Sequence, residues 1–391
     1  MQLERFEKSP IGRLVPIQGH DARLGRDYRH FAYIPNPLPT KIDLTQRTLK
    51  LLSEADRSVG ALKAMTRLIP RPNLLVGPAL TKEALATSAL EGTYAPFMDV
   101  LEGEYLDVRK QSAEVREIRN YVRAAQRGLK LIKELPICMR VAAELQGILV
   151  SGTRGDGYGA GRVRERQVCI GDRGLGIEQS RFVPPPHGLE LEAGLSDWEK
   201  WINSEDDIPL LVKFAVGHYQ FETLHPFSDG NGRIGRLLIT LQLIDADVLE
   251  FPILNLSPWL EPRRDAYTDH LLRVSESGNF DPWIAFFAEA VKARADAASA
   301  TIESLLKMRE NFIGQLRRSG ARGIAVDLAG DLIGYPILAV SDVVDLYGVS
   351  YPAANSAVER LVRLGLLHEI TGGNYARIFR CDPVFDVIQD S

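Results

Sequence analysis

A single loop between two apolar stretches constrains the fold of this 391-residue chain more than any other feature. The stretch before it, LLVKFAVGHYQFETL, has the apolar content of a buried helix, and a second long apolar helix is predicted to begin near Arg233. His225, Asp229 and the Gly-Asn-Gly run at 230–232 lie between them. This run predicts a tight turn directly before a helix. The chain must therefore fold so that the turn joins the ends of two packed helices.

The residue types in this loop predict phosphate chemistry. Glycines before a helix N-terminus leave backbone N–H groups pointing outward, where the helix dipole favours an anion. Arg233 and Arg236 lie three residues apart, so both can face one pocket and bind phosphate. Asp229 offers a hard oxygen ligand to Mg²⁺, and His225 can accept a hydroxyl proton near neutral pH. Each residue alone also fits a capped helix start, and the Walker A pattern is absent.

The stretch from His225 to Arg236 resembles the signature of the Fic family, HPFx[DE]GNGRxxR, at every defined position. The resemblance implies a protein adenylyltransferase, which transfers AMP from Mg-ATP to a Ser, Thr or Tyr hydroxyl of a protein. It implies that His225 deprotonates this hydroxyl, that Asp229 holds Mg²⁺ and that Arg236 binds the γ-phosphate. The nucleotide contacts expected in this loop are Asp229, Gly230, Asn231, Gly232, Arg233, Ile234, Gly235 and Arg236.

A basic segment at 161–171, GRVRERQVCIG, resembles the flap of the same family. The flap is a hairpin that binds the target backbone by strand addition and covers the nucleotide. Alternation around 163–167 predicts such a hairpin, and an ordinary exposed basic hairpin is the alternative. The resemblance implies that four residues border ATP, namely Val168, Cys169, Ile170 and Gly171.

The segment after the loop, LNLSPWLEPRRDAYTDHLLRV, resembles the family segment that closes over adenine. Two adjacent tyrosines are common there, and this chain keeps Tyr267 but has Ala266 at the other position. Two roles for Tyr267 remain open, which are contact with adenine and packing in the core.

Residues Thr87 to Gly92 resemble the inhibitory helix motif of the family, [ST]xxxE[GN]. They end a helix that is expected to begin at Thr81 as its N-cap. The resemblance implies that Glu91 pairs with Arg236 and misplaces the γ-phosphate, so that the α-phosphorus is not in line for attack. The alternative for the motif is an ordinary C-terminal helix cap.

Periodicity and Pro- or Gly-rich breaks divide the chain into four parts. The predicted fold is mainly α, with a Fic helical core, a β-hairpin flap, an N-terminal helical region and a C-terminal winged helix-turn-helix. The parts are 1–115, an arm and helical region with the inhibitory helix; 116–290, the Fic catalytic domain; 291–330, a connecting helix; and 331–391, the winged helix. We expect residues 1 to about 45 to be irregular, because no clear periodicity is present.

The last part reads as helix, turn, helix and two strands. Ser341 and Ser350 are the expected N-caps, and a turn at 372–374 is expected to join the strands. This part has eight acidic and four basic residues, which disfavours DNA because affinity for DNA depends on Lys and Arg. Protein binding or dimerisation is an alternative use of a winged helix, and a nucleotide-sensing transcription regulator is the competing function.

The remaining features suggest a soluble cytoplasmic enzyme with a protein substrate. The net charge of −4 gives no field that favours nucleic acid or membranes, and no segment reads as a leader or a membrane span. The three cysteines have neither metal-ligand nor disulfide spacing. The substrate could be another protein or the enzyme itself, and self-association is open.

Related transfer reactions are also compatible with the loop. Members of the family move UMP or phosphocholine, and the Doc-like branch moves phosphate. Doc-like proteins carry Lys where this chain has Gly232, which argues against phosphorylation. Removal of AMP by the same site also remains open.

Overall fold

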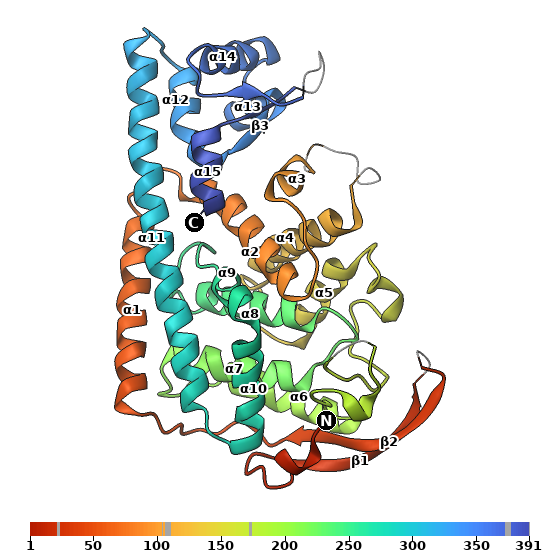
Figure 1. The fold of residues 1–391 in the computed structure, drawn as a ribbon. Helices are drawn as coiled ribbons and strands as arrows, with labels where there is room; N and C mark the ends of the chain where they lie inside the picture. The colour runs from red at the N-terminus through yellow and green to blue at the C-terminus, as the bar shows by residue number, and fades with distance from the viewer. Residues whose placement is uncertain (22–23, 104, 106–110, 172–173, 372–376, 391) are drawn as a thin grey trace.

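The computed structural model describes residues 1–21, 24–103, 105, 111–171, 174–371 and 377–390. The fold is mainly α-helical, as predicted, with two small antiparallel sheets (Figure 1). The helices are α1 Gln46–Thr66, α2 Val76–Leu90, α3 Phe97–Glu102, α4 Ala113–Leu131, α5 Met139–Val150, α6 Leu189–Ile202, α7 Leu210–Leu224, α8 Asn231–Asp245, α9 Ser257–Leu260, α10 Arg264–Ser277, α11 Asp281–Arg318, α12 Ile324–Asp331, α13 Val340–Tyr347, α14 Tyr351–Arg363 and α15 Asp382–Asp390. The strands are β1 Gly12–Asp21, β2 Arg26–Pro35, β3 Ile337–Ala339, β4 His368–Glu369 and β5 Ile378–Arg380.

Helices α7 and α8 lie at the centre of the molecule and meet at the loop that the sequence singles out. Both are buried along almost their whole length, as expected of helices that are apolar on all sides. The Nε1–H of Trp283 on α11 donates to the carbonyl of Ala215 on α7 at 2.8 Å, which fixes the long helix against this pair. The loop between α7 and α8 is therefore held by packed helices on both sides.

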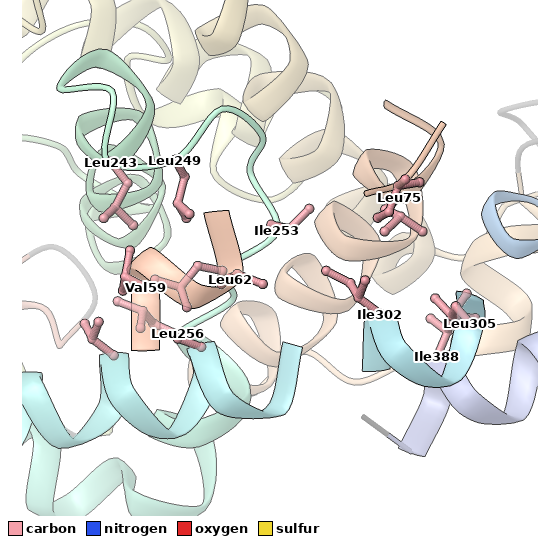
Figure 2. Packing of buried hydrophobic residues seen from close by; sticks show 14 of the residues in the cluster. Val59, Leu62, Leu75, Leu243, Leu249, Ile253, Leu256, Ile302, Leu305 and Ile388 are labelled. Carbon is pink, nitrogen blue, oxygen red and sulfur yellow. The ribbon is translucent and has the colours of Figure 1, made fainter. Parts of the chain in front are cut away.

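Helix α11 is 38 residues long, which corresponds to about 57 Å. It runs beside α1 and continues from the central helices to the C-terminal part (Figure 1). Figure 2 shows how side chains from distant parts of the sequence pack together along it. The labelled residues of this cluster are Val59, Leu62, Leu75, Leu243, Leu249, Ile253, Leu256, Ile302, Leu305 and Ile388.

The prediction of an irregular N-terminal arm is wrong, because β1 and β2 form a long antiparallel hairpin. Only the end of β2 is buried, where Tyr33 packs against Phe6 and Phe182. The backbone N–H of Tyr33 also donates to the carbonyl of Val183 at 2.9 Å. Residues 150 positions away in the chain stabilise this strand, so the sequence around it gives little indication that a strand forms there.

The inhibitory motif lies at the end of α2, but this helix does not begin at Thr81 as predicted. It begins at Val76, and Pro78 is tolerated in its first turn because no intrahelical partner is needed there. Thr81 lies inside the helix, and its hydroxyl donates to the carbonyl of Gly77 at 2.9 Å. Gly92 follows the helix with φ +85°, which fits its predicted role as a stop.

The alternation at 163–167 does not form paired strands. Among the described residues of this region, antiparallel pairing is limited to one bridge between Ile170 and Phe182. The amide of Ile170 donates to the carbonyl of Phe182 at 2.8 Å, and the amide of Arg181 donates back to Ile170 at 2.8 Å. The predicted flap is thus a folded-back segment rather than a regular hairpin.

The C-terminal part has the predicted helix-turn-helix, α13 and α14, beside a three-stranded sheet in the order β3-β5-β4. Ser350 occupies the N-cap position of α14, as predicted. Ser341 is not the cap of α13, because the helix begins at Val340 and Asp342 accepts the N–H of Ala339 at 2.7 Å. The expected turn at 372–374 lies outside the described residues.

The lengths and compositions of the described helices decide whether any of them could span a bilayer. None of them combines the length and the apolar composition that crossing a membrane requires.

The packing of α1 predicts a position-dependent loss of stability. Leu62 is fully buried, so Leu62→Ala should lower the free energy of unfolding by about 2–5 kcal/mol through lost burial and a cavity. The matched control is Leu68→Ala just after the same helix, where the side chain is 69% exposed and the expected change is below about 0.5 kcal/mol. Urea unfolding followed by tryptophan fluorescence measures both, and equal losses would contradict the packing.

Candidate active site

Helix α7 ends directly before His225, which begins the loop between α7 and α8. His225 follows the last helical residue in a left-handed conformation, with φ 51°. Its Nδ1 lies 3.2 Å from the backbone carbonyl oxygen of Glu222. A carbonyl only accepts, so Nδ1 carries the proton of the neutral ring and Nε2 keeps a free lone pair. The backbone thereby selects the tautomer in which Nε2 is the base.

The surroundings of His225 keep its imidazole neutral. Burial lowers the pKa of His225, the nearby Arg164 guanidinium lowers it further, and the result is about 4. The carboxylates of Glu91 and Asp229 act in the opposite direction but are weaker. The ring is therefore unprotonated at neutral pH and free to accept a proton.

The turn after His225 is fixed by the Asn231 side chain. Its Oδ1 accepts the N–H of Phe227 and its Nδ2 donates to the carbonyl of Phe227, both at 2.8 Å. Gly230 has φ +84°, and a side-chain carbon there would also come within 2.9 Å of Leu149. Asn231 thus acts on the shape of the loop, and Gly230 is required by its backbone and its close packing.

Asp229 offers the carboxylate that the sequence predicted for Mg²⁺. Its Oδ1 accepts the N–H of Gly230 at 2.7 Å and lies 3.5 Å from Arg233 Nη2, while its Oδ2 is 4.0 Å from Arg154. The Asp229 side chain is 20% exposed and lines the central cavity. In the described part of the chain, no cluster of three or more His, Cys, Asp or Glu could hold a metal. A single carboxylate fits Mg²⁺, which completes its shell with water and substrate phosphates.

Arg236 is buried and makes the predicted contact with Glu91. Arg236 Nη2 lies 2.8 Å from Glu91 Oε1, and its Nε donates to the Thr87 hydroxyl at 2.7 Å. Burial opposes ionisation of Glu91, but Arg236 outweighs it and the pKa of Glu91 is lowered. A side-chain carbon at Gly232 would collide with the Glu91 carboxylate. Residues of the Thr87–Gly92 motif therefore contact the guanidinium to which the family resemblance gives a γ-phosphate role.

The other arginine of the loop, Arg233, has a different environment. It is 3% exposed, and its Nη1 pairs with Oε1 of the buried Glu117 on α4. The Thr93 hydroxyl donates to the same Glu117 oxygen at 3.2 Å. Arg233 is thus tied to α4 and, through Glu117 and Thr93, to the residue that follows the Thr87–Gly92 motif.

A cavity of about 1240 Å³ brings most of the predicted site residues together. Three of the predicted residues, Arg233, Ile234 and Gly235, are not part of its lining. The predicted residues that line it are Glu91, Val168, Cys169, Ile170, Gly171, His225, Asp229, Gly230, Asn231, Gly232, Arg236 and Tyr267.

Tyr267 combines features of both roles considered for it. It lines the cavity but is only 4% exposed. Its hydroxyl lies 2.7 Å from His218 Nε2, and the two rings stack with centroids 6.0 Å apart. Adenine contact by Tyr267 stays a prediction.

The cavity also has walls that the sequence reasoning missed. The β1–β2 hairpin contributes residues 18–21 and Tyr28, and Arg154 and Glu222 lie on other sides. Burial raises the pKa of Glu222 to about 7. The signal that could have found Glu222 is an acid inside an otherwise apolar helix, three residues before His225. No local sequence pattern indicates that the β1–β2 hairpin or Arg154 lines this cavity.

Two family models match the parts of the chain that contain Glu91, the predicted flap and the His225 loop. The Fic/DOC family N-terminal model matches residues 49–130, and the Fic/DOC family model matches residues 136–243. The chain belongs to the Fic/DOC family. The N-terminal match contains the inhibitory motif, and the second match contains the predicted flap and the His225 loop.

Curated relatives in the Fic/DOC family are protein adenylyltransferases by name. Protein adenylyltransferase fic-1 of Caenorhabditis elegans is 32% identical over 136 residues, which is 34% of this chain and 23% of that protein. Protein adenylyltransferase Fic of Nematostella vectensis is 33% identical over 150 residues, 37% of this chain and 31% of that protein. The chain thus spans a third or less of the length of these relatives.

A solved structure shows the same fold over most of the chain. The crystal structure of a Fic family protein from Desulfovibrio desulfuricans G20 covers 88% of this chain and 98% of its own, with a TM-score of 0.57 and 20% sequence identity. This likeness confirms the predicted Fic fold.

The Asn231 contacts predict that the loop contributes to stability. Asn231→Ala leaves the buried N–H and carbonyl of Phe227 without their side-chain partner, which should lower the free energy of unfolding by about 1–3 kcal/mol. The control is Asn203→Ala, because the Asn203 side chain also makes two 2.8 Å hydrogen bonds to backbone groups, both as donor, but is exposed, so water replaces them. Urea unfolding should show a clearly smaller loss for the control.

Proposed function

We propose that this chain is a protein adenylyltransferase that transfers AMP from Mg-ATP to a Ser, Thr or Tyr hydroxyl of a protein substrate. The observation that carries the proposal is the neutral imidazole of His225 on the same cavity as Asp229, the Gly230–Gly232 turn and the Arg236 guanidinium. The curated relatives support the reaction class by their names.

The chemistry follows from the groups that line the cavity. Nε2 of His225 takes the proton of the target hydroxyl, whose oxygen forms a bond to the α-phosphorus as the bond to pyrophosphate breaks. The backbone N–H groups at the start of α8 face an anion and stabilise its charge. Asp229 would hold Mg²⁺, which when bound supplies charge neutralisation on the phosphates. A freed Arg236 would hold the γ-phosphate, so that pyrophosphate leaves in line.

Glu91 keeps this site inactive in the proposal. Arg236 donates to Glu91 through Nη2 and to Thr87 through Nε and Nη2, so Glu91 and Thr87 compete with a third phosphate group for the guanidinium. The Glu91 side chain is 36% exposed, so it can leave the pair without crossing a packed core.

The C-terminal contacts support an enzyme over a DNA-binding regulator. Arg377 pairs with Glu359 and Glu369, and Arg380 pairs with Asp382. Arg360 of α14 donates to the carbonyl of Ser319 at 3.0 Å. These guanidinium groups are already engaged within the protein, which lowers the number available to neutralise DNA phosphates.

Removal of the Glu91 carboxylate should release activity. Glu91→Gly is expected to raise AMP transfer by about tenfold or more, within the usual range of coupling between sites. The further change His225→Ala should lower transfer by at least about 100-fold, because the general base is lost. Labelled ATP with cell lysate, followed by mass spectrometry of modified proteins, measures both effects.

Glu91→Gln is the matched control, because it keeps the size of the side chain and removes only its charge. An intermediate gain in this variant assigns the inhibition to the ion pair. The mass added to the target identifies the group, since AMP, UMP, phosphocholine and phosphate differ. No gain with Glu91→Gly would refute inhibition by Glu91, and an added group other than AMP would refute adenylyl transfer.

The lowered pKa of His225 predicts an unusual acid tolerance of the chemistry. A base with a pKa of about 4 stays unprotonated well below neutral pH, whereas an ordinary histidine is half protonated near pH 6.5. Transfer by Glu91→Gly should therefore show no histidine-dependent fall between roughly pH 7.5 and 5.5. Initial rates at constant ionic strength measure this profile, with fluorescence to confirm that the protein stays folded.

A further inference from the structure

Arg164 is a buried cation that the proposed reaction does not use. Arg164 is 4% exposed. Within the described residues its side chain donates to backbone carbonyls, and no carboxylate pairs with it. Burial lowers the pKa of Arg164 to about 10, so the group remains charged at neutral pH. A buried charge without an ion partner needs strong compensation from nearby dipoles.

Backbone carbonyl groups supply this compensation, and two of them belong to the catalytic loop. Arg164 Nε donates to the carbonyl of His225 at 2.9 Å, and its Nη2 lies 3.4 Å from the carbonyl of Leu224. The backbone N–H of Arg164 also donates to the carbonyl of Pro226 at 2.9 Å. These carbonyls lie at the C-terminal end of α7, where the helix dipole is negative and favours a cation.

The same guanidinium also contacts both ends of residues 166–185, here called the flap segment, which contains the second half of the predicted flap at 161–171. Its Nη1 donates to the carbonyl of Arg166 at 3.1 Å, and its Nη2 donates to the carbonyl of Pro185 at 2.6 Å. The chain between these two carbonyls includes the bridge at Ile170 and the cavity-lining residues 168–171. One side chain therefore connects the turn that carries the base with the segment that covers the cavity.

We propose that Arg164 is a positioning residue, which holds the His225 turn and both ends of the flap segment in one fixed arrangement. This inference deepens the proposed function and rests on it for its effect on activity. Without the guanidinium, the carbonyl of His225 loses the hydrogen bond from Arg164 Nε. This hydrogen bond then no longer helps to hold the left-handed backbone conformation of His225. The base and the wall that covers the nucleotide would then move independently.

The electrostatic setting of His225 gives a second, separable effect. Three charged groups act on the His225 ring: Arg164, which precedes the flap segment, Glu91 at the end of α2 and Asp229 in the turn. The backbone carbonyl of Glu222 on α7 acts on the ring through a hydrogen bond. Arg164 is the one among these that disfavours the imidazolium form. Loss of its charge therefore favours protonation of His225 and moves the acid limb of activity toward neutral pH.

Two substitutions separate the charge from the hydrogen bonds. Both are made in full-length Glu91→Gly protein, whose own AMP transfer must first be established. Arg164→Met keeps much of the volume and removes both charge and donors, and should lower kcat by about 100-fold through misplacement of the base. Arg164→Lys keeps the charge with fewer directed donors, and should give an intermediate kcat with an unshifted acid limb.

Two local measurements do not depend on activity. Hydrogen exchange of Arg164→Met should rise in peptides covering 164–186 and 224–228 and stay unchanged in α1 and α11. The imidazole signals of the seven histidines, with that of His225 assigned through His225→Gln, should show a higher pKa of His225 in Arg164→Met than in Arg164→Lys. A kcat for Arg164→Met within about threefold of the parent, or exchange that is unchanged in both segments, would overturn the proposal.

Failure of the proposed function would give a different set of experimental results from failure of the positioning role. If the Glu91→Gly parent transfers no AMP, adenylyl transfer is refuted, while hydrogen exchange and the histidine titration still decide whether Arg164 fixes the two segments. If the parent is active and Arg164→Met loses activity with no change in exchange or in the pKa of His225, the positioning role is refuted and the enzyme assignment stands.

Discussion

Two hydrogen bonds from one amide side chain set the geometry on which the site depends. Asn231 holds both backbone groups of Phe227, so the turn between α7 and α8 has a single shape. The end of α7 then presents His225, and the start of α8 presents its free N–H groups and Arg236, on the same cavity. The proposed base and the proposed anion site come together because the two buried helices meet at this turn, and neither helix alone would form the cavity wall.

The two arginines of the loop share a common arrangement, in which each is paired with a carboxylate from the N-terminal helices. Arg236 contacts Glu91 at the end of α2, and Arg233 contacts Glu117 on α4. The pairs differ in burial, since the Glu117 side chain is 10% exposed and that of Glu91 is 36% exposed. A buried pair is costly to break, whereas a partly exposed pair exchanges more readily with water or a ligand. The two contacts therefore differ in how much solvent reaches them, and the Glu91 contact is the more exposed of the two.

Local patterns predicted the helices and the catalytic loop well, and long-range contacts account for what they missed. The apolar stretch at 210–224 forms the predicted buried helix as α7, and the loop motif correctly grouped His225, Asp229 and Arg236 around one cavity. The β1–β2 hairpin could not be found, because its buried end is stabilised by residues near 182. The partners of Arg164 are backbone carbonyls at distant positions, and a sequence carries no pattern for such contacts.

The length of α11 has a mechanical consequence for whatever binds the C-terminal part. The helix is fixed to α7 through Trp283, and its distant turns share one continuous core with α12 and α14. The C-terminal part is therefore joined to the central helices by one continuous helix that is packed along its length, and not by a flexible linker (Figure 1). Under the proposed adenylyl transfer, a protein bound by that part would be held at one distance and orientation from the cavity, so the length of α11 would limit which of its hydroxyl groups can approach His225.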